Sequence, residues 1–231
     1  MTTGSAGDDV STVEVREAYT ERAEEYISLL GSVADMHELD RALISRWAGR
    51  LDGPVLDAGC GPGHWADHLL RLGNDVEGVD LVPAFVARAR ERFPEVPFRV
   101  ATFDDLGVAD AELGGVLAWY SLIHLEPARV PAALEEFARC LRPGGSLLLG
   151  FFDGARLEPF PHKVVTAYFW PPAEMTERLE AAGFTVEEVH TRAEAGSRPL
   201  AAIVARRNDA GHETPTARRG PLRHRRARER A

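Results

Sequence analysis

Three glycines, Gly59, Gly61 and Gly63, follow a short apolar segment in the sequence VLDAGCGPGH. A glycine-rich turn between a strand and a helix lets the backbone approach a ligand closely, so this turn is the first candidate for chemistry. The dinucleotide-binding pattern GxGxxG requires a glycine at position 64, where this chain has His64. A phosphate-binding P-loop requires Gly-Lys-Ser/Thr, which does not follow the turn. The turn therefore favours a ligand that places no pyrophosphate on the start of the helix.

Two carboxylates near this turn indicate which ligand it holds. Asp80 ends the apolar segment EGVD, 17 residues after Gly63, where an acidic residue can accept hydrogen bonds from ribose hydroxyls. Asp57 lies just before the glycines, where its charge would repel a phosphate and attract a cation. A nucleoside that carries a positive charge and no phosphate is S-adenosylmethionine, and the sequence predicts it as the cofactor.

Apolar segments that fit strands alternate with helical patterns from Pro54 onward. This alternation predicts an α/β fold with a doubly wound, mostly parallel sheet and helices on both faces. The last two expected strands are joined by AEAGSR, which is too short for a helical crossover, so they should be antiparallel. The expected strands are residues 54–59, 75–80, 97–103, 114–122, 146–152, 184–191 and 199–207, and the expected helices are residues 63–72, 83–93, 130–141 and 172–184.

The segment before this core has a helical pattern over residues 11–47. Ser11 and Glu14 have the spacing of a capping box, which predicts a helix start there. After a break at Gly31, a second helix is expected to bury a stripe formed by Leu39, Leu43, Ile44 and Trp47. The expected organisation is a flexible N-terminus over residues 1–10, a helical segment over 11–50, the α/β core over 51–207 and a disordered Arg-rich tail over 208–231.

The distribution of charge limits the partners of a chain whose net charge is −9. Residues 208–231 contain seven arginines and three acidic residues, whereas residues 1–207 contain 20 Lys and Arg against 33 Asp and Glu. An acidic body argues against nucleic acid as a partner. The tail combines Pro, Gly and Arg without apolar periodicity, which predicts a solvated segment, with a charge-driven contact to nucleic acid or membrane as the alternative.

The sequence predicts a cytoplasmic protein without a membrane partner or a metal. No stretch approaches the ~18 apolar residues of a membrane span, and the acidic start MTTGSAGDDV has no apolar leader. The only cysteines, Cys60 and Cys140, form neither a disulfide framework nor a CxxC site. His64 and His68 lie four residues apart without the glutamate of an HExxH motif, so they are interpreted as helix surface.

Four segments, VLDAGCGPG, GVDLVP, WYSLIHL and LRPGGSLLLGFF, resemble in order and spacing the class I S-adenosylmethionine-dependent methyltransferases. The resemblance covers about residues 13–207 and implies a seven-stranded Rossmann-like sheet whose last strand is antiparallel. It also implies that Asp57, Gly59 and Gly61 line the methionine part of the cofactor. Asp80 would hold the ribose, and Leu81 would pack on the adenine.

The resemblance leaves two cofactor contacts open. Many members of the family have an acidic residue at the position of Thr102, which contacts the adenine amino group. Here that contact is expected from the Phe103 backbone, from Asp104, or from neither. The segment AYTERAEEY resembles a helix that caps the cofactor in small-molecule methyltransferases, so Tyr19 and Tyr26 are candidates to reach the cofactor carboxylate. The alternative is that both tyrosines are core residues.

Methyl transfer is an in-line displacement at a sulfonium carbon. The protein must align the nucleophile and remove its proton where it carries one. His124 in WYSLIHL is the candidate base, because an imidazole titrates near neutral pH. The alternative is a histidine that only holds the loop. Tyr120 and Ser121 are expected to contact the cofactor or the acceptor.

A second cluster of candidates follows the fifth expected strand. The cluster includes Phe152 as a candidate for binding the acceptor. The three adjacent aromatic residues of FPHKVVTAYFWPP, Tyr168, Phe169 and Trp170, could form one wall of a pocket for the acceptor. His162 is a weaker second candidate base. The alternative is ordinary packing of a connecting segment.

The leading hypothesis is an S-adenosylmethionine-dependent methyltransferase that acts on a small molecule. A nicotinamide-dependent oxidoreductase shares the sheet and Asp80 but needs the missing glycine at position 64. A protein that binds the cofactor without catalysis is the third possibility. The sequence specifies neither the acceptor, nor the methylated atom, nor the oligomeric state.

Overall fold

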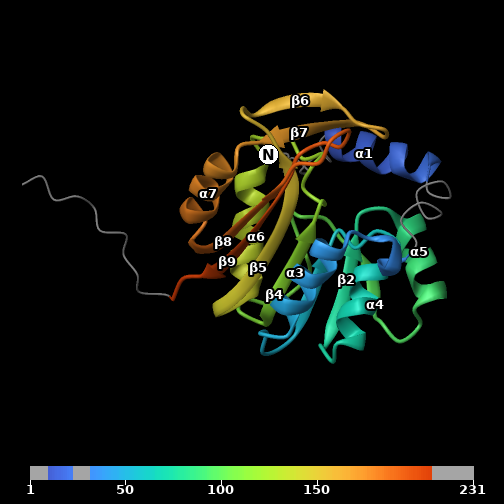
Figure 1. Ribbon diagram of the computed structural model, residues 1–231. Helices are drawn as coiled ribbons and strands as arrows, with labels where there is room; N and C mark the ends of the chain where they lie inside the picture. Colours follow the sequence, from blue (N-terminus) through green and yellow to red (C-terminus); the bar gives the residue numbers. More distant parts are fainter. Residues whose placement is uncertain (1–9, 23–31, 210–231) are drawn as a thin grey trace, which may run out of the picture.

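The computed structural model describes residues 10–22 and 32–209. In these residues nine strands form one sheet in the order β3-β2-β1-β4-β5-β7-β6, with β9 paired to both β5 and β8 (Figure 1). Strands β1 to β5 are parallel to one another. Their bounds are β1 Val55–Ala58, β2 Val76–Asp80, β3 Phe98–Val100, β4 Leu113–Trp119, β5 Leu141–Asp153, β6 Glu158–Pro161, β7 Thr166–Trp170, β8 Phe184–Arg192 and β9 Leu200–Arg207.

Helices cover both faces of the sheet, with α3, α4 and α5 on one face and α6 and α7 on the other (Figure 1). Neighbouring residues of the central strand β4 point to opposite faces. Val116 packs on the side of α6 and α7, and Leu117 packs on the side of α3 and α4. The helices are α1 Val10–Glu21, the 3-10 turn η1 Val33–Asp35, α3 Glu38–Ala48, α4 His64–Arg71, α5 Pro83–Arg92, α6 Val130–Cys140 and α7 Pro172–Ala181.

The predicted seven-stranded, mostly parallel sheet is confirmed as the run β3-β2-β1-β4-β5-β9-β8. Strand β9 is antiparallel to β5, and β8 is antiparallel to β9, as the short segment between the last two strands predicted. Because β1, β2 and β4 are parallel neighbours, their carboxyl ends lie at the same edge of the sheet, near its centre.

Two further strands, β6 and β7, form an antiparallel hairpin that the sequence did not predict. The hairpin joins the sheet through β7, which pairs in parallel with the carboxyl end of β5 at Phe152 and Asp153. Pro159 and Pro161 in β6 made this segment resemble a connecting loop. Proline is tolerated here because β6 is an edge strand, where its missing N–H leaves no sheet hydrogen bond unmade.

The N-terminal helices differ from the expectation in two details. Helix α1 begins at Val10, so Ser11 lies inside the helix rather than at the N-cap of a capping box. Helix α3 begins after His37, whose Nδ1 accepts a hydrogen bond from the Leu39 amide. Leu43, Ile44 and Trp47 are buried as predicted, but the Leu39 side chain is 61% exposed, because the first turn of α3 projects beyond the core. The expected stripe was wrong at Leu39.

Candidate functional site

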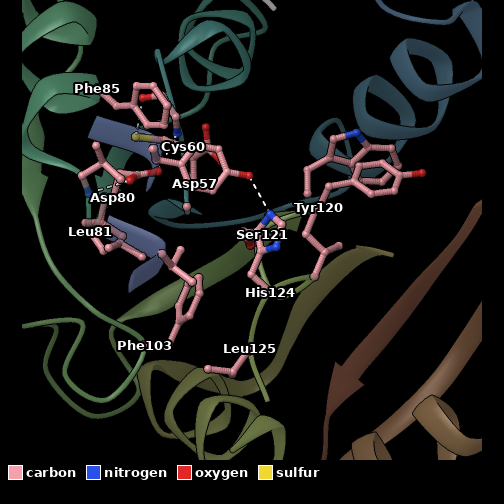
Figure 2. A pocket seen from close by; sticks show the side chains of 18 of the residues that line it. Asp57, Cys60, Asp80, Leu81, Phe85, Phe103, Tyr120, Ser121, His124 and Leu125 are labelled. Atoms are coloured by element: carbon pink, nitrogen blue, oxygen red, sulfur yellow. Dashed lines mark hydrogen bonds between the residues drawn. The ribbon is translucent and has the colours of Figure 1, made fainter. Parts of the chain in front are cut away.

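One large cavity opens at the carboxyl ends of β1, β2 and β4, where ligands bind in open α/β sheets. Its volume is about 370 Å³, which is within the range of small-molecule sites. In Figure 2, Asp80, Leu81 and Phe103 lie on one side of His124, and Tyr120 lies on the other. Helix α1 adds Val15 and Tyr19 to the lining, so it closes the cavity from above the sheet edge. Tyr26 lies outside the described residues.

The glycine turn brings bare backbone to the wall of this cavity. Gly59 has a φ angle of 80°, a left-handed conformation that favours glycine, and its amide donates to the Val79 carbonyl. A Cβ atom on Gly59 would overlap the Cβ atom of Ser121, so the turn and the loop after β4 pack directly against each other. A Cβ atom on Gly61 would meet nothing within 4 Å. The backbone at Gly61 is therefore open to a ligand.

Asp80 holds this turn in place and still has capacity for a ligand. Its Oδ2 accepts a hydrogen bond from the Gly61 amide at 2.9 Å, and its Oδ1 accepts one from the Val82 amide at 2.8 Å. Burial raises the pKa of Asp80 to about 6, against the opposing effect of these amide bonds. A carboxylate has about four lone-pair sites, so roughly two remain for hydroxyl groups such as those of a ribose.

Asp57 is a buried carboxyl group that lacks a partner for one oxygen. Burial, and then the charge of Asp80, raise the pKa of Asp57 to about 8. Among residues 10–22 and 32–209, its Oδ2 has no hydrogen-bond partner, and neither does the buried Oγ of Ser121 beside the glycine turn. A cation in the cavity would favour the charged form of Asp57 and offset its burial. The residues present therefore fit a cofactor with a positively charged amino-acid tail.

The far end of the cavity suits a flat apolar group. Leu81 and Phe103 line it, and the Phe103 ring packs edge-on against Phe137 at a centroid distance of 5.8 Å. Asp104 also lines this end, but both of its carboxylate oxygens accept hydrogen bonds from Nη2 of Arg129, at 2.6 and 2.8 Å. Asp104 is thus already engaged by a cation, and a contact to the adenine amino group stays a prediction.

His124 forms a chain of hydrogen bonds that fixes its tautomer. Its Nδ1 lies 2.8 Å from the Thr166 carbonyl oxygen, which can only accept, so Nδ1 carries the proton. Its Nε2 lies 2.7 Å from the Tyr19 hydroxyl and accepts a hydrogen bond from it. Burial lowers the pKa of His124, which keeps the ring neutral near neutral pH. The Tyr19 hydroxyl is therefore hydrogen-bonded to His124, and a further contact from Tyr19 to a cofactor carboxylate stays a prediction.

The hairpin brings the second histidine close to the first. The rings of His124 and His162 have a centroid distance of 5.1 Å, and the His162 ring lies 5.9 Å from that of Phe152. Burial, and then the neighbouring His124, lower the pKa of His162 to about 4. His162 and Phe152 line the cavity together with Ser121.

Tyr168 and Trp170 lie elsewhere. Both belong to β7, where residues two apart share a face, and both pack with the core on the side of α6 and α7. Trp170 is fully buried there, and neither residue lines the cavity. The intervening Phe169 points to the opposite face and packs on Phe160 at 4.1 Å between centroids. Three adjacent aromatic residues of a strand therefore cannot form one wall.

Tyr120 has a backbone conformation that marks the site. Its φ angle is 54°, which is rare for a residue with a side chain and clusters at functional sites. Its ring lies between Trp119 and Phe152, at centroid distances of 5.3 and 5.5 Å. Burial raises the pKa of Tyr120, so its hydroxyl stays protonated near neutral pH.

The sequence missed several residues that line the cavity. His64 was interpreted as helix surface, but it is buried, lines the cavity and has its pKa lowered to about 4 by burial. Its position directly after the glycine turn was the available signal. Trp65 and Trp119 also line the cavity and were not singled out. His68 instead bonds with the Ser45 hydroxyl at 2.9 Å.

No group of three or more His, Cys, Asp or Glu side chains in residues 10–22 and 32–209 is arranged to hold a metal ion. No helix in the same ranges is long and apolar enough to cross a membrane.

Comparisons with known proteins agree with this geometry. A family model of the methyltransferase domain matches residues 55–145. The chain is 37% identical over 155 residues to a protein of Mycolicibacterium smegmatis named a probable S-adenosylmethionine-dependent methyltransferase, which covers 63% of this chain and 56% of that one. It is 31% identical over 184 residues to a ubiquinone biosynthesis O-methyltransferase of Xanthomonas axonopodis pv. citri, covering 69% of this chain and 75% of that one.

A solved structure has the same fold. The 1,6-didemethyltoxoflavin-N1-methyltransferase of Burkholderia thailandensis, with bound 1,6-didemethyltoxoflavin and S-adenosylhomocysteine, superposes with a TM-score of 0.72 at 24% identity. The match covers 90% of this chain and 94% of that one. Several curated relatives are matched over only part of their length, 56% for the Mycolicibacterium protein and 52% for a Xanthomonas oryzae ubiquinone biosynthesis O-methyltransferase.

The sheet order, the glycine turn with its two carboxylates and these similarities together define a class of protein. The chain belongs to the class I S-adenosylmethionine-dependent methyltransferases. S-adenosylmethionine is the cofactor of this family.

Proposed function

We propose that the protein transfers a methyl group from S-adenosylmethionine to a small-molecule acceptor. The observation that carries this proposal is Asp57, a buried carboxyl group beside an open glycine turn, with one oxygen that has no hydrogen-bond partner among the described residues. A pyrophosphate beside Asp57 would disfavour the charged form of Asp57 further and would give this buried carboxyl group no cationic partner. The relatives named above support an acceptor of low molecular mass.

The residues that would hold the cofactor follow from the lining of the cavity. Asp80 would accept hydrogen bonds from the ribose hydroxyls, and Leu81 and Phe103 would enclose the adenine. The backbone at Gly59 and Gly61 would hold the methionine part. When bound, the cofactor supplies an electrophilic methyl carbon on a sulfonium sulfur. The protein contributes alignment and the exclusion of water, because the cavity is lined largely by buried side chains.

Proton removal falls to the pair formed by Tyr19 and His124. An acceptor hydroxyl that donates to the Tyr19 oxygen passes its proton to that oxygen, while Tyr19 gives its own proton to Nε2 of His124. The Thr166 carbonyl oxygen, already bonded to Nδ1, then stabilises the imidazolium. The low pKa of the resting imidazole ensures that it starts neutral and able to accept a proton.

The proposed function is tested first by binding. Isothermal titration calorimetry of the full chain with S-adenosylhomocysteine should show one site, whereas NADH should show none. Methyl transfer from labelled S-adenosylmethionine into a small-molecule metabolite extract should then be detected above a protein-free control. Binding of NADH without binding of S-adenosylhomocysteine would favour the oxidoreductase. Binding of S-adenosylhomocysteine without transfer to any extract would favour a protein that only holds the cofactor.

Replacing His124 by alanine is expected to slow methyl transfer to a hydroxyl acceptor by about 10²- to 10⁴-fold, the usual contribution of a general base. Tyr19→Phe should show a loss of the same order, because it keeps the ring packing and removes the bridging hydroxyl. Affinity for S-adenosylhomocysteine should change less than threefold in the His124 variant. The matched control is His190→Ala, a histidine on β8 that does not line the cavity. Undiminished transfer by His124→Ala would show that His124 is structural.

A further inference from the structure

Six aromatic rings form a continuous arc along one side of the cavity. In order they are Trp65, Trp119, Tyr120, Phe152, His162 and His124, and all of them line the cavity. Successive ring centroids lie 6.3, 5.3, 5.5, 5.9 and 5.1 Å apart, and the rings meet edge-on or tilted. We call this set the aromatic arc. Ring edges and faces at these spacings favour contact with another planar ring.

The aromatic arc is separate from the part of the cavity that fits the cofactor. Asp80, Leu81 and Phe103 come from the β2 and β3 side of the sheet, whereas the arc is built on α4, β4, the loop after β4, β5 and the turn between β6 and β7. Figure 2 shows Tyr120 and Asp80 on opposite sides of the cavity, with Ser121 and His124 between them. A second molecule bound along the arc therefore lies next to the methionine end of the cofactor and beyond His124.

The described part of the lining has no free positive charge that could hold an anionic acceptor. Within the described residues, Arg129 is the only Lys or Arg that lines the cavity, and it is bonded to Asp104 at the adenine end. The segments 1–9 and 23–31 contain no Lys or Arg, and the seven arginines of residues 210–231 lie outside the described residues. Burial lowers the pKa values of His124 and His162, so both rings are neutral near neutral pH. The charges of Arg198, Lys163 and Arg22 reach His162, but none of these three residues lines the cavity. A carboxylate or phosphate buried against the lining would therefore lack a direct cationic partner there, which is unfavourable.

The lining does contain four carboxyl groups, those of Asp40, Asp57, Asp80 and Asp104. Asp40 lies at the acceptor side, where Arg192 binds both of its oxygens, at 2.9 and 3.0 Å. This ion pair leaves Asp40 neutralised, so it neither repels an uncharged acceptor nor demands a cationic one. The other three carboxyl groups, those of Asp57, Asp80 and Asp104, lie in the part of the cavity that fits the cofactor.

The hydrogen bond between Tyr19 and His124 indicates which acceptor atom the site serves. A base is needed when the nucleophile carries a proton that must leave, as a hydroxyl does. Nε2 of His124 is this base, and the Tyr19 hydroxyl bonded to it can pass a proton to it from the cavity.

From these three features we infer that the acceptor is an uncharged hydroxyaromatic molecule whose ring lies along the aromatic arc and whose hydroxyl faces Tyr19. This inference rests on the proposed methyl transfer. The acceptor oxygen forms a bond to the methyl carbon while the bond from that carbon to sulfur breaks. The electron pair of the broken bond stays on sulfur, which becomes a neutral thioether. The hydroxyl proton passes through Tyr19 to His124.

The test uses three matched probes and the full chain saturated with S-adenosylhomocysteine. The probes are 2-naphthol, its saturated analogue decahydro-2-naphthol and its carboxylated analogue 6-hydroxy-2-naphthoate. Their dissociation constants are measured by calorimetry at pH 7. We expect 2-naphthol to bind at least tenfold more tightly than either analogue. Decahydro-2-naphthol lacks an aromatic ring face, and 6-hydroxy-2-naphthoate brings a carboxylate without a cationic partner.

A variant of the aromatic arc then tests where the ring lies. Phe152→Leu should weaken 2-naphthol about three- to tenfold and leave decahydro-2-naphthol within twofold, since only the aromatic contact is lost. The control is Phe93→Leu, at the end of α5 and outside the cavity. Affinity of the Phe152 variant for S-adenosylhomocysteine reports whether the site is still formed.

The outcomes separate this inference from the proposed function. If S-adenosylhomocysteine itself does not bind, the proposed methyl transfer is overturned. If it binds but 2-naphthol does not, or if either analogue binds as tightly as 2-naphthol, the hydroxyaromatic acceptor is overturned and methyl transfer stands. Equal weakening by Phe152→Leu and Phe93→Leu would also overturn the placement of the ring.

Discussion

Replacing Gly59 by alanine is expected to lower the free energy of unfolding by about 2–5 kcal/mol, through left-handed strain and overpacking together. The φ angle of 80° disfavours any side chain, and the new Cβ atom would overlap Ser121 of the loop after β4. One of the two segments must move, and both line the cofactor end of the cavity. Affinity for S-adenosylhomocysteine should therefore fall as well, by roughly tenfold or more. Urea denaturation and calorimetry measure the two effects.

Gly73→Ala is the matched control for this substitution. Gly73 follows the C-cap residue of helix α4 and has a φ angle of 91°, but a Cβ atom there would meet nothing within 4 Å. Its replacement should lower the free energy of unfolding by only about 1–2 kcal/mol, the left-handed strain alone. It should leave S-adenosylhomocysteine binding unchanged. Equal destabilisation by the two substitutions would contradict the close packing of the glycine turn on Ser121.

Replacing Asp80 by alanine is expected to weaken S-adenosylhomocysteine binding by about 1.5–3 kcal/mol, or roughly 10- to 150-fold in Kd. Two effects act in the same direction. The ribose loses an acceptor, and the Gly61 amide loses the carboxylate that holds the turn. Calorimetry at pH 7.5, above the Asp80 pKa of about 6, measures the loss with the carboxylate charged.

Asp75→Ala is the control, because Asp75 is an exposed carboxylate just before β2, the strand that ends in Asp80. Its removal changes the net charge equally and should alter the affinity less than twofold. Unchanged affinity in the Asp80 variant would remove Asp80 from the site.

The fold was largely predictable because its signals are local. Alternation of apolar and helical segments predicted the parallel strands, and the short link before the last strand predicted its antiparallel direction. The hairpin of β6 and β7 was not predicted because its signal is not local. Pro159 and Pro161 indicate a loop unless the segment is known to lie at a sheet edge. The exposure of Leu39 likewise depends on where the first turn of α3 ends relative to the core.

The cofactor side of the candidate site was predictable for a similar reason. Asp57, Gly59, Gly61 and Asp80 lie at the ends of two strands, and the topology alone brings those ends together. The acceptor side depends on contacts between distant segments. Tyr19 and His124 are 105 residues apart in the chain, and no pattern predicts that they form a hydrogen bond. The positions of Tyr168 and Trp170 were decided by strand alternation in β7, which could not be applied before β7 was known.

The hairpin of β6 and β7 links two properties that a protein engineer would want to vary separately. It carries His162, which lines the cavity and belongs to the proposed acceptor wall, and it also supplies the Thr166 carbonyl that orients the His124 proton. The Tyr168 amide further binds the Ile123 carbonyl, next to His124. Exchanging this hairpin to widen the range of acceptors would therefore also change which ring nitrogen of His124 carries the proton. A productive graft must keep a carbonyl oxygen at the position of Thr166.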